Sequence, residues 1–227
     1  MFIKTRFKQL MNFIIRMLSH TKKNITKFFK WVVFVKKNYS QSIPIYTKDE
    51  SSGLKIHLGA GEVNLQGWIN IDARKFTHIH LVSDGFDLSG FKDASADEVY
   101  TSHVLEHFSF EESEKFIEKI YNILRPGGLF RISVPDIEKL LDLYKEQKKL
   151  GIIKKAIMGG QNYPNDFHKS IYDFNELKII LEKNNFKNIK SWNTEIVFGQ
   201  SIGDWSDGYY KHNGKKFDIS LNLVAQK

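Results

Sequence analysis

The stretch from Lys55 to Asp72 constrains the fold of this chain more than any other. An apolar run ends there in Gly59-Ala60-Gly61, and a second apolar run, residues 68–71, ends in Asp72. Glycine permits a sharp turn and the close approach of a ligand to the backbone. An acidic residue at the tip of the next strand can accept hydrogen bonds from the hydroxyls of a ribose. This order favours a nucleotide-type site in a parallel α/β sheet, although a two-glycine loop taken alone is most often a simple turn.

The pattern that follows predicts strands alternating with helices. Strands are expected at residues 55–58, 68–71, 78–83, 98–102, 129–134, 189–196 and 217–224. Helices are expected after three capping residues, Ser109, Asp136 and Asp173, with Arg125-Pro126-Gly127-Gly128 ending the first of them. Such alternation indicates an α/β fold: a Rossmann-like, open, mostly parallel sheet with flanking helices.

Positive charge is concentrated at the N-terminus. Residues 1–48 contain 11 of the 34 Lys and Arg residues and no Asp or Glu, so the rest of the chain has 23 basic and 26 acidic residues, a net charge of −3. The predicted organisation is a basic amphipathic helical arm at residues 1–39, a polar linker at 40–53 and a globular domain at 54–227. The acidic balance of that domain argues against nucleic acid as a partner.

Three interpretations of the arm stay open. Residues 1–37 could lie on an anionic membrane surface, with lysines near phosphates and aromatic side chains inserted, or could pack on a protein surface. An organelle transit peptide is the third, and it is less favoured because Lys far outnumbers Arg and Ser is scarce. The uncharged runs of this segment are much shorter than the roughly 18 apolar residues of a membrane span. The expected location is the cytoplasm, peripheral at the inner face of the membrane if the first interpretation holds. The chain has no cysteine, which excludes disulfides and thiolate chemistry.

Six short motifs give the chain a family resemblance. They are His57-Leu-Gly-Ala-Gly61, Gly67-Trp-Ile-Asn-Ile-Asp72, Asp87-Leu88, Ala96-Asp-Glu-Val-Tyr100, His103-Val-Leu-Glu-His107 and Leu124-Arg-Pro-Gly-Gly128. In this order and spacing the chain resembles class I S-adenosylmethionine-dependent methyltransferases over about residues 54–226. It is most similar to small predicted methyltransferases associated with the synthesis of surface polysaccharides.

The resemblance implies a cofactor, S-adenosylmethionine, and a set of residues that bind it. Gly59, Ala60 and Gly61 would meet the amino-acid end of the cofactor, and Asp72 would hold the ribose hydroxyls. Asp87 with Leu88 would stand beside the adenine, with Asp84 as the competing acid. Ser102 and His103 would border the methyl-donor pocket. The connection from Gly61 to residue 69 is short for a helical crossover, which predicts one turn of helix or none.

The segment His103-Val-Leu-Glu106-His107 also matches the H-x-x-E-H pattern of some zinc proteases. That pattern requires a helix, whereas here a strand is predicted up to Ser102 and a helix cap at Ser109. No metal ligands are therefore predicted. The candidates for a general base are His103 and His168, because imidazole titrates near neutral pH.

The predicted function is methyl transfer to a hydroxyl of a glycan or glycan precursor. Two polar loops that contain aromatic residues, Gly159–Pro164 and Gly203–Tyr210, suit a carbohydrate and equally suit loops anchored by an aromatic side chain. The alternative is a catalytically silent methyltransferase-like scaffold tethered to a membrane or a partner.

Overall fold

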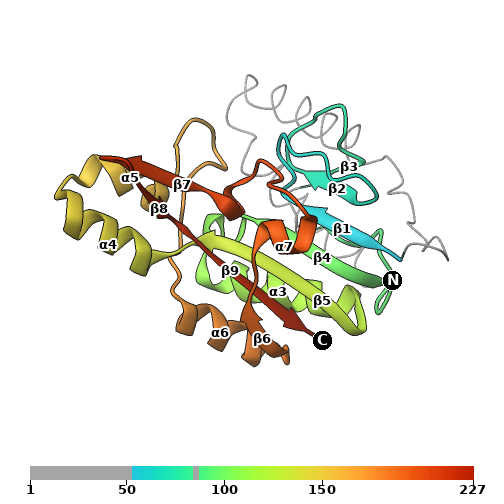
Figure 1. Ribbon diagram of the computed structural model, residues 1–227. Coiled ribbons are helices and arrows are strands. Elements are labelled where there is room, and N and C mark those ends of the chain that lie inside the picture. Colours follow the sequence, from blue (N-terminus) through green and yellow to red (C-terminus); the bar gives the residue numbers. More distant parts are fainter. Residues whose placement is uncertain (1–52, 84–86) are drawn as a thin grey trace, which may run out of the picture. The chain divides into compact units, whose positions relative to one another are not determined.

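Seven strands form one sheet in the order β3-β2-β1-β4-β5-β9-β6 (Figure 1). The computed structural model describes residues 53–83 and 87–227, so the predicted arm, all but the last residue of the linker, and Asp84 lie outside the described residues. The strands of this sheet are β1 (Lys55–Leu58), β2 (Ile69–Asp72), β3 (Leu81–Val82), β4 (Ala96–Ser102), β5 (Leu124–Pro135), β6 (Lys187–Ser191) and β9 (Ser220–Gln226).

The first five strands are parallel, and β9 runs antiparallel between β5 and β6. The chain proceeds from β1 outward through β2 to β3 and then returns to place β4 on the other side of β1. The strand order therefore reverses between β1 and β4. In open α/β sheets, ligands bind outside the carboxyl ends of the strands at such a reversal.

The structure describes five helices, and three of them begin where the capping residues predict. The five are α3 (Phe110–Ile123), α4 (Ile137–Gln147), α5 (Leu150–Met158), α6 (Phe174–Lys183) and α7 (Thr194–Phe198). Ser109 and Glu112 form a reciprocal capping box at the start of α3. Asp136 and Asp173 accept hydrogen bonds from backbone N–H groups at the start of α4 and α6. These caps satisfy amides that have no partner within the helix, and all three predicted helix starts are confirmed.

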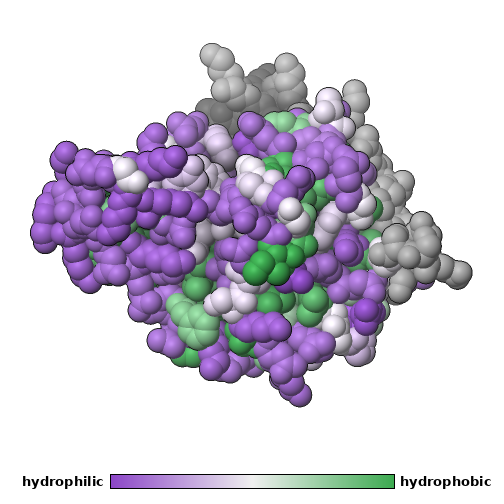
Figure 2. Space-filling model, in the orientation of Figure 1, coloured by the Kyte–Doolittle hydropathy of each residue, from purple (hydrophilic) through white to green (hydrophobic). Residues whose placement is uncertain are grey.

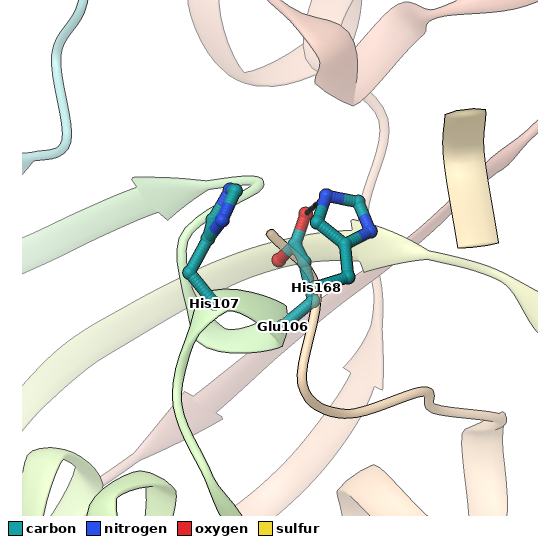
Figure 3. A group of neighbouring side chains, drawn as sticks. All are labelled: Glu106, His107 and His168. Carbon is teal, nitrogen blue, oxygen red and sulfur yellow. Dashed lines mark ion pairs between the residues drawn. The ribbon is translucent and has the colours of Figure 1, made fainter. Parts of the chain in front are cut away.

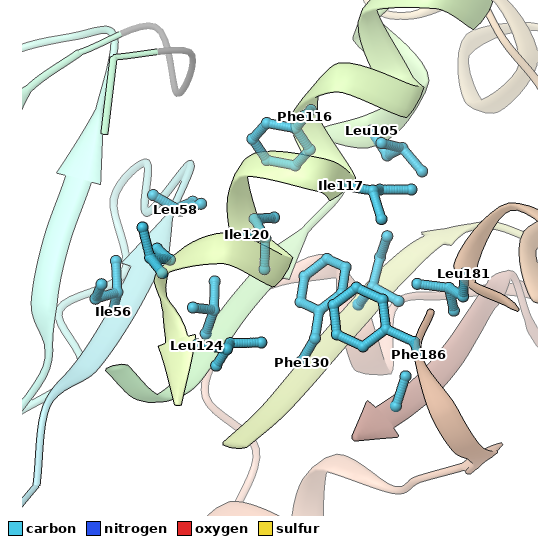
Figure 4. Close-up of a cluster of buried hydrophobic side chains, with 14 of the residues drawn as sticks. Ile56, Leu58, Leu105, Phe116, Ile117, Ile120, Leu124, Phe130, Leu181 and Phe186 are labelled. Atoms are coloured by element: carbon cyan, nitrogen blue, oxygen red, sulfur yellow. The ribbon is translucent and has the colours of Figure 1, made fainter. Parts of the chain in front are cut away.

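The two faces of the sheet are covered by different elements. Val99 packs in the main hydrophobic cluster with Phe116, Ile120 and Leu181, from α3 and α6 (Figure 4). Successive strand residues point to opposite faces, and Tyr100 accordingly packs in a separate cluster on the other face, with α7 against it. Helices on both faces confirm the predicted fold class.

Several predicted elements differ from the structure. The connection between β1 and β2 contains turns and no helix, which is one of the two outcomes predicted. The strand predicted at residues 78–83 is reduced to Leu81–Val82. The predicted strand at 189–196 is wrong in its second half, because Asn193 caps α7 with a hydrogen bond from the Ile196 N–H.

The single strand predicted at residues 217–224 corresponds to parts of two separate strands. Residues 217–224 contain the end of β8 (Lys215–Asp218) and the start of β9, and β8 pairs with β7 (Tyr209–His212) in a separate hairpin. Helix α5 was not predicted. Together with α4, α5 and this hairpin form a small second cluster that includes Leu143 and Ile153.

The surface of the view in Figure 2 is mainly hydrophilic, particularly over α4, α5, β7 and β8. A hydrophobic patch near the middle of the view overlies α7, where the Ile196 side chain is 85% exposed. Among the helices described, none combines the length and the hydrophobicity that a membrane crossing requires.

Candidate functional site

The loop after β1 is shaped by two glycines in the left-handed backbone region. Gly59 has φ +69° and Gly61 has φ +53°. A Cβ atom on Gly59 would lie 2.1 Å from Val104 Cγ2, so no other residue fits there without displacing Val104. The loop therefore lies directly against the segment that follows β4, at the point where the strand order reverses.

Asp72 fixes this loop to the end of β2. Its Oδ2 accepts a hydrogen bond from the Gly61 N–H at 2.7 Å, and its Oδ1 accepts one from the Arg74 N–H, also at 2.7 Å. A carboxylate offers about four acceptor positions. Arg74 Nε also donates to Oδ1, at 3.4 Å, so three of the four are used within the protein and one is left for a ligand hydroxyl. The Arg74 guanidinium lies 5.3 Å from the centre of the Tyr163 ring and links β2 to a loop far along the chain.

The segment after β4 contains a group of histidines around one buried carboxylate. Glu106 is 1% exposed and lies in the short 3-10 helix Leu105–His107. Its Oε1 is 3.3 Å from His103 Nδ1 and 3.9 Å from His168 Nε2. Burial raises the pKa of Glu106, but the imidazoles of His103, His107 and His168 outweigh burial and leave that pKa below its ordinary value.

His103 uses both ring nitrogens inside the protein. The Ser220 hydroxyl donates to the carbonyl of Trp205, so Ser220 Oγ accepts from His103 Nε2–H at 2.8 Å. The other nitrogen faces Glu106. His103 also has φ +53°, an uncommon conformation for a non-glycine residue. This backbone conformation holds the imidazole in its position. His103 therefore lies at the site, but its nitrogens are already engaged.

His168 is arranged differently. Its Nδ1 lies 3.0 Å from the Ala156 carbonyl oxygen. Because a carbonyl only accepts, Nδ1 carries the hydrogen in the neutral ring and Nε2 has a lone pair. Burial is the main cause that lowers the pKa of His168 below its ordinary value. The neutral form, with Nε2 available as a base or a ligand, is thereby favoured.

A cavity of about 570 Å³ connects these groups. The glycine loop, with Glu62, forms one wall, and His103, His107 and His168 form part of another. The loops at residues 160–166 and 203–210 complete it, contributing Tyr163, Asp204, Trp205 and Tyr210. The volume lies within the roughly 300–1,000 Å³ of small-molecule sites. Both polar, aromatic loops singled out from the sequence therefore meet at one place.

Of the residues predicted to bind the cofactor, Gly59, Ala60, Gly61, Ser102 and His103 line the cavity. The remaining three lie beside it or away from it. Asp72 lies behind the glycine loop, and the Leu88 side chain is buried in the main core. The Asp87 carboxylate accepts hydrogen bonds from the N–H and the hydroxyl of Ser89. Roles for Asp87 and Leu88 beside an adenine stay predictions.

The side chains of the cavity wall that sequence reasoning did not assign to the site include Glu62, Arg74 and Asp204. Asp204 accepts a hydrogen bond from the buried Tyr100 hydroxyl, and its other oxygen accepts from the Ser206 N–H and hydroxyl. Burial, with Asp204 beside it, raises the pKa of Tyr100. Only the Gly203-Asp204-Trp205 turn indicated this position, because the pairing of Tyr100 with Asp204 depends on tertiary structure.

Residues 66–132 match a family model described as a methyltransferase domain. The match begins just before β2 and ends within β5. It therefore includes Asp72 and the His103–His107 segment. A search of curated protein sequences finds no match to this chain.

Solved structures with a similar fold include a SAM-dependent methyltransferase from Archaeoglobus fulgidus. It is 15% identical, with 87% of this chain and 99% of that chain covered and a TM-score of 0.49. Another, from Methanosarcina mazei, is 17% identical, with 78% and 93% covered and a TM-score of 0.47. The 1,6-didemethyltoxoflavin-N1-methyltransferase of Burkholderia thailandensis is 14% identical, with 77% and 70% covered and a TM-score of 0.47. These similarities are too low to assign an acceptor.

Over residues 66–132 the chain is therefore similar to methyltransferase domains, and the resemblance described from the sequence implies S-adenosylmethionine as the cofactor. The residues present fit this cofactor. The cavity adjoins a loop that Gly59 and Gly61 keep free of side chains. The carboxylates of Glu62 and Asp204 line it, and they suit a ligand that carries a sulfonium and an ammonium charge. A silent scaffold is not favoured by this match.

Proposed function

We propose that this protein transfers a methyl group from S-adenosylmethionine to a hydroxyl of a glycan or glycan precursor. The observation that supports this acceptor class best is the set of aromatic and polar side chains that line the cavity. Tyr163, Trp205 and Tyr210 lie there among Asn162 and Asp204. A sugar presents apolar C–H faces and hydroxyls together, so aromatic rings next to amide and carboxylate groups suit it.

The bound cofactor supplies an electrophilic methyl group, and the protein's own residues position the acceptor. Methyl transfer requires the attacking oxygen in line with the methyl carbon, so orientation contributes much of the catalysis. The glycine loop and the histidine group lie on different walls of one cavity. His168 Nε2, with its lone pair, is better placed than His103 to accept a hydroxyl proton, because both His103 nitrogens are engaged.

The cofactor part of the proposal is tested by titrating the full chain with S-adenosylhomocysteine in a calorimeter. We expect micromolar binding, weakened at least tenfold by Asp72→Ala, since that variant releases the glycine loop from β2. Asp142→Ala is the matched control, because Asp142 is an exposed carboxylate on α4, paired with Lys145. Binding that Asp72→Ala leaves unchanged would remove the basis of the site assignment.

The acceptor part is tested separately with tritiated S-adenosylmethionine. Nucleotide sugars, lipid-linked saccharides and free oligosaccharides are compared with amines, peptides and nucleic acids. Label in the saccharide fraction, located on an oxygen by mass spectrometry, is the expected result. Label confined to amines or to peptides would overturn the acceptor class while leaving methyl transfer intact.

A further inference from the structure

A carboxylate and two imidazoles from distant parts of the chain converge beside the cavity. Figure 3 shows Glu106, His107 and His168 with their polar ends directed toward one another. Glu106 and His107 come from the turn after β4, and His168 from the loop that precedes α6. The Lys169 and Ser170 N–H groups both donate to the Glu106 carbonyl oxygen, at 2.7 and 3.1 Å. These two bonds hold the segments together.

Both imidazoles are oriented by backbone carbonyls. His168 Nδ1 is 3.0 Å from the oxygen of Ala156, and His107 Nδ1 is 3.3 Å from the oxygen of Phe167. Each neutral ring therefore carries its hydrogen on Nδ1 and a lone pair on Nε2. A histidine that binds a metal through one nitrogen usually donates its other N–H to a carbonyl or a carboxylate. The arrangement required of metal ligands is thus present in both rings.

The Glu106 carboxylate is buried and has unused acceptor capacity, and a buried carboxylate without partners is unfavourable. The residue is 1% exposed, and neither carboxylate oxygen accepts a hydrogen bond from any residue that the structure describes. His103 Nδ1 lies 3.3 Å from Oε1, but the hydrogen of the neutral His103 ring is on Nε2, which donates to Ser220. A buried carboxylate without hydrogen bonds is destabilised unless a cation compensates it. A metal ion between Glu106 and the two Nε2 atoms would supply that compensation.

The spacing and chemistry of the three groups indicate which class of metal ion they would bind. One ligand atom from each residue lies within 4.8 Å of the others. Two ligands that each bind at about 2.1 Å are at most about 4.2 Å apart, so small side-chain rotations close the site. Two imidazoles and one carboxylate suit zinc and other divalent first-row transition metals rather than magnesium or calcium. Three protein ligands leave coordination positions open, and His107 and His168 line the cavity.

We infer that Glu106, His107 and His168 bind one divalent transition-metal ion whose open positions face the cavity. Metal binding itself does not depend on the identity of the acceptor. The catalytic use of the ion does depend on it, and this part rests on the proposed function. An acceptor hydroxyl bound to the ion would lose its proton more readily. His168 would then be a metal ligand and no longer the general base. The H-x-x-E-H segment contributes only its second half, because the segment follows a strand and its last three residues form a 3-10 turn.

The test uses the full chain without an affinity tag, treated with a chelator and then titrated with Zn²⁺ by calorimetry and with Co²⁺ by visible absorption. We expect one ion per chain with micromolar or tighter affinity, and visible Co²⁺ absorption bands that appear on titration and saturate at one ion per chain. His107→Ala and His168→Ala should each weaken binding at least tenfold. His212→Ala, in the β7–β8 hairpin, is the matched control and should bind as the unaltered chain does.

Folding and function are separated by two further measurements. Thermal unfolding shows whether a variant is folded, and His168→Asn replaces His168→Ala if the alanine variant is not. Zinc binding that survives both histidine substitutions, or its absence from the unaltered chain, would overturn the site. Retained S-adenosylhomocysteine binding in the same samples would show that the proposed function is unaffected. If methyl transfer is lost in His168→Ala but never depends on metal, His168 acts as a base and the proposed use of the ion is wrong.

Discussion

Gly59 combines two constraints that can be separated by mutation. Its φ of +69° disfavours any L side chain, and an added Cβ would lie 2.1 Å from Val104 Cγ2. Gly199 has a similar φ of +73° but no atom within 4 Å of an added Cβ. We expect Gly199→Ala to lower the free energy of unfolding by about 1–2 kcal/mol, the cost of the left-handed conformation alone. Gly59→Ala should cost a further 1–3 kcal/mol or so, because it also overpacks the loop.

Urea denaturation of the two alanine variants measures this difference. A third variant, Gly59→Ala combined with Val104→Ala, should recover the packing part of the loss and not the conformational part. Equal losses in Gly59→Ala and Gly199→Ala would show that the loop relaxes away from Val104.

His57 makes stability depend on pH. The side chain, which comes from β1, is buried and stacks on the Tyr100 ring, and its Nδ1 lies 3.1 Å from Asn70 Oδ1. Burial lowers the pKa of His57 from 6.5 to about 4. Between these two pH values the unfolded chain binds the proton more strongly than the folded chain. Stability due to His57 is therefore complete above pH 6.5 and is lost as the pH falls toward 4, by about 3 kcal/mol.

The measurement compares unfolding free energies of the unaltered chain and His57→Gln at pH 7.5, 6, 5 and 4. Glutamine has no titration in this range, so the difference between the two proteins should shift by about 3 kcal/mol from pH 7.5 to 4 in favour of the variant. A difference that stays constant with pH would show that His57 does not change its protonation on unfolding.

Helix α3 begins with a reciprocal capping box, which makes its first turn a local unit of stability. Ser109 Oγ accepts from the Glu112 N–H, and Glu112 Oε2 accepts from the Ser109 N–H at 2.8 Å. Ser109→Ala should lower the free energy of unfolding by about 1 kcal/mol. Glu112→Gln keeps an acceptor for the Ser109 N–H and should lower the free energy of unfolding by only about a few tenths of a kcal/mol. Chemical denaturation distinguishes them, and equal losses would indicate that charge rather than capping stabilises this turn.

The elements that could be predicted from the sequence are those with local signals. Ser109, Asp136 and Asp173 each mark a helix start by their own side-chain chemistry. Helix α5 was missed because its N-cap residue, Lys149, makes no side-chain capping bond. The β7–β8 hairpin had a signal that was not used. Asn213 and Gly214 both have positive φ, and an Asn-Gly pair between two strands is a strong indication of a hairpin turn.

Across the whole molecule, the site could be predicted only in part. The glycine loop, Asp72 and the His103–His107 segment follow strands, and the parallel sheet brings their carboxyl ends together. No such rule places His168, because its position is set by contacts between distant segments. The Glu106 carbonyl accepts from Lys169 N–H and Ser170 N–H, and that clamp cannot be read from spacing.

One buried hydrogen bond connects the sheet to the far wall of the cavity. The Tyr100 hydroxyl, from β4, donates to Asp204 Oδ2 in the loop at residues 203–208. Tyr100→Phe removes the hydroxyl donor and leaves Asp204 Oδ2 without this hydrogen bond. A hydrogen bond to a charged group contributes about 1.5–3 kcal/mol. The variant should therefore lose about 2 kcal/mol of unfolding free energy, and the loop should open more readily.

Hydrogen–deuterium exchange measures the second effect directly. Amides of residues 203–208 should exchange faster in Tyr100→Phe, while those of α3, on the opposite face of the sheet, should not. Tyr121→Phe is the matched control, since Tyr121 lies on α3 and does not line the cavity. If the two variants exchange alike at residues 203–208, the loop is held by other bonds, such as those from Ser220 and Asn222 of β9 to its carbonyls, and not by Tyr100. Faster exchange in Tyr100→Phe alone would mean that the hydrogen bond from β4 to Asp204 holds the loop at residues 203–208 in place. The acceptor is proposed to bind against this loop.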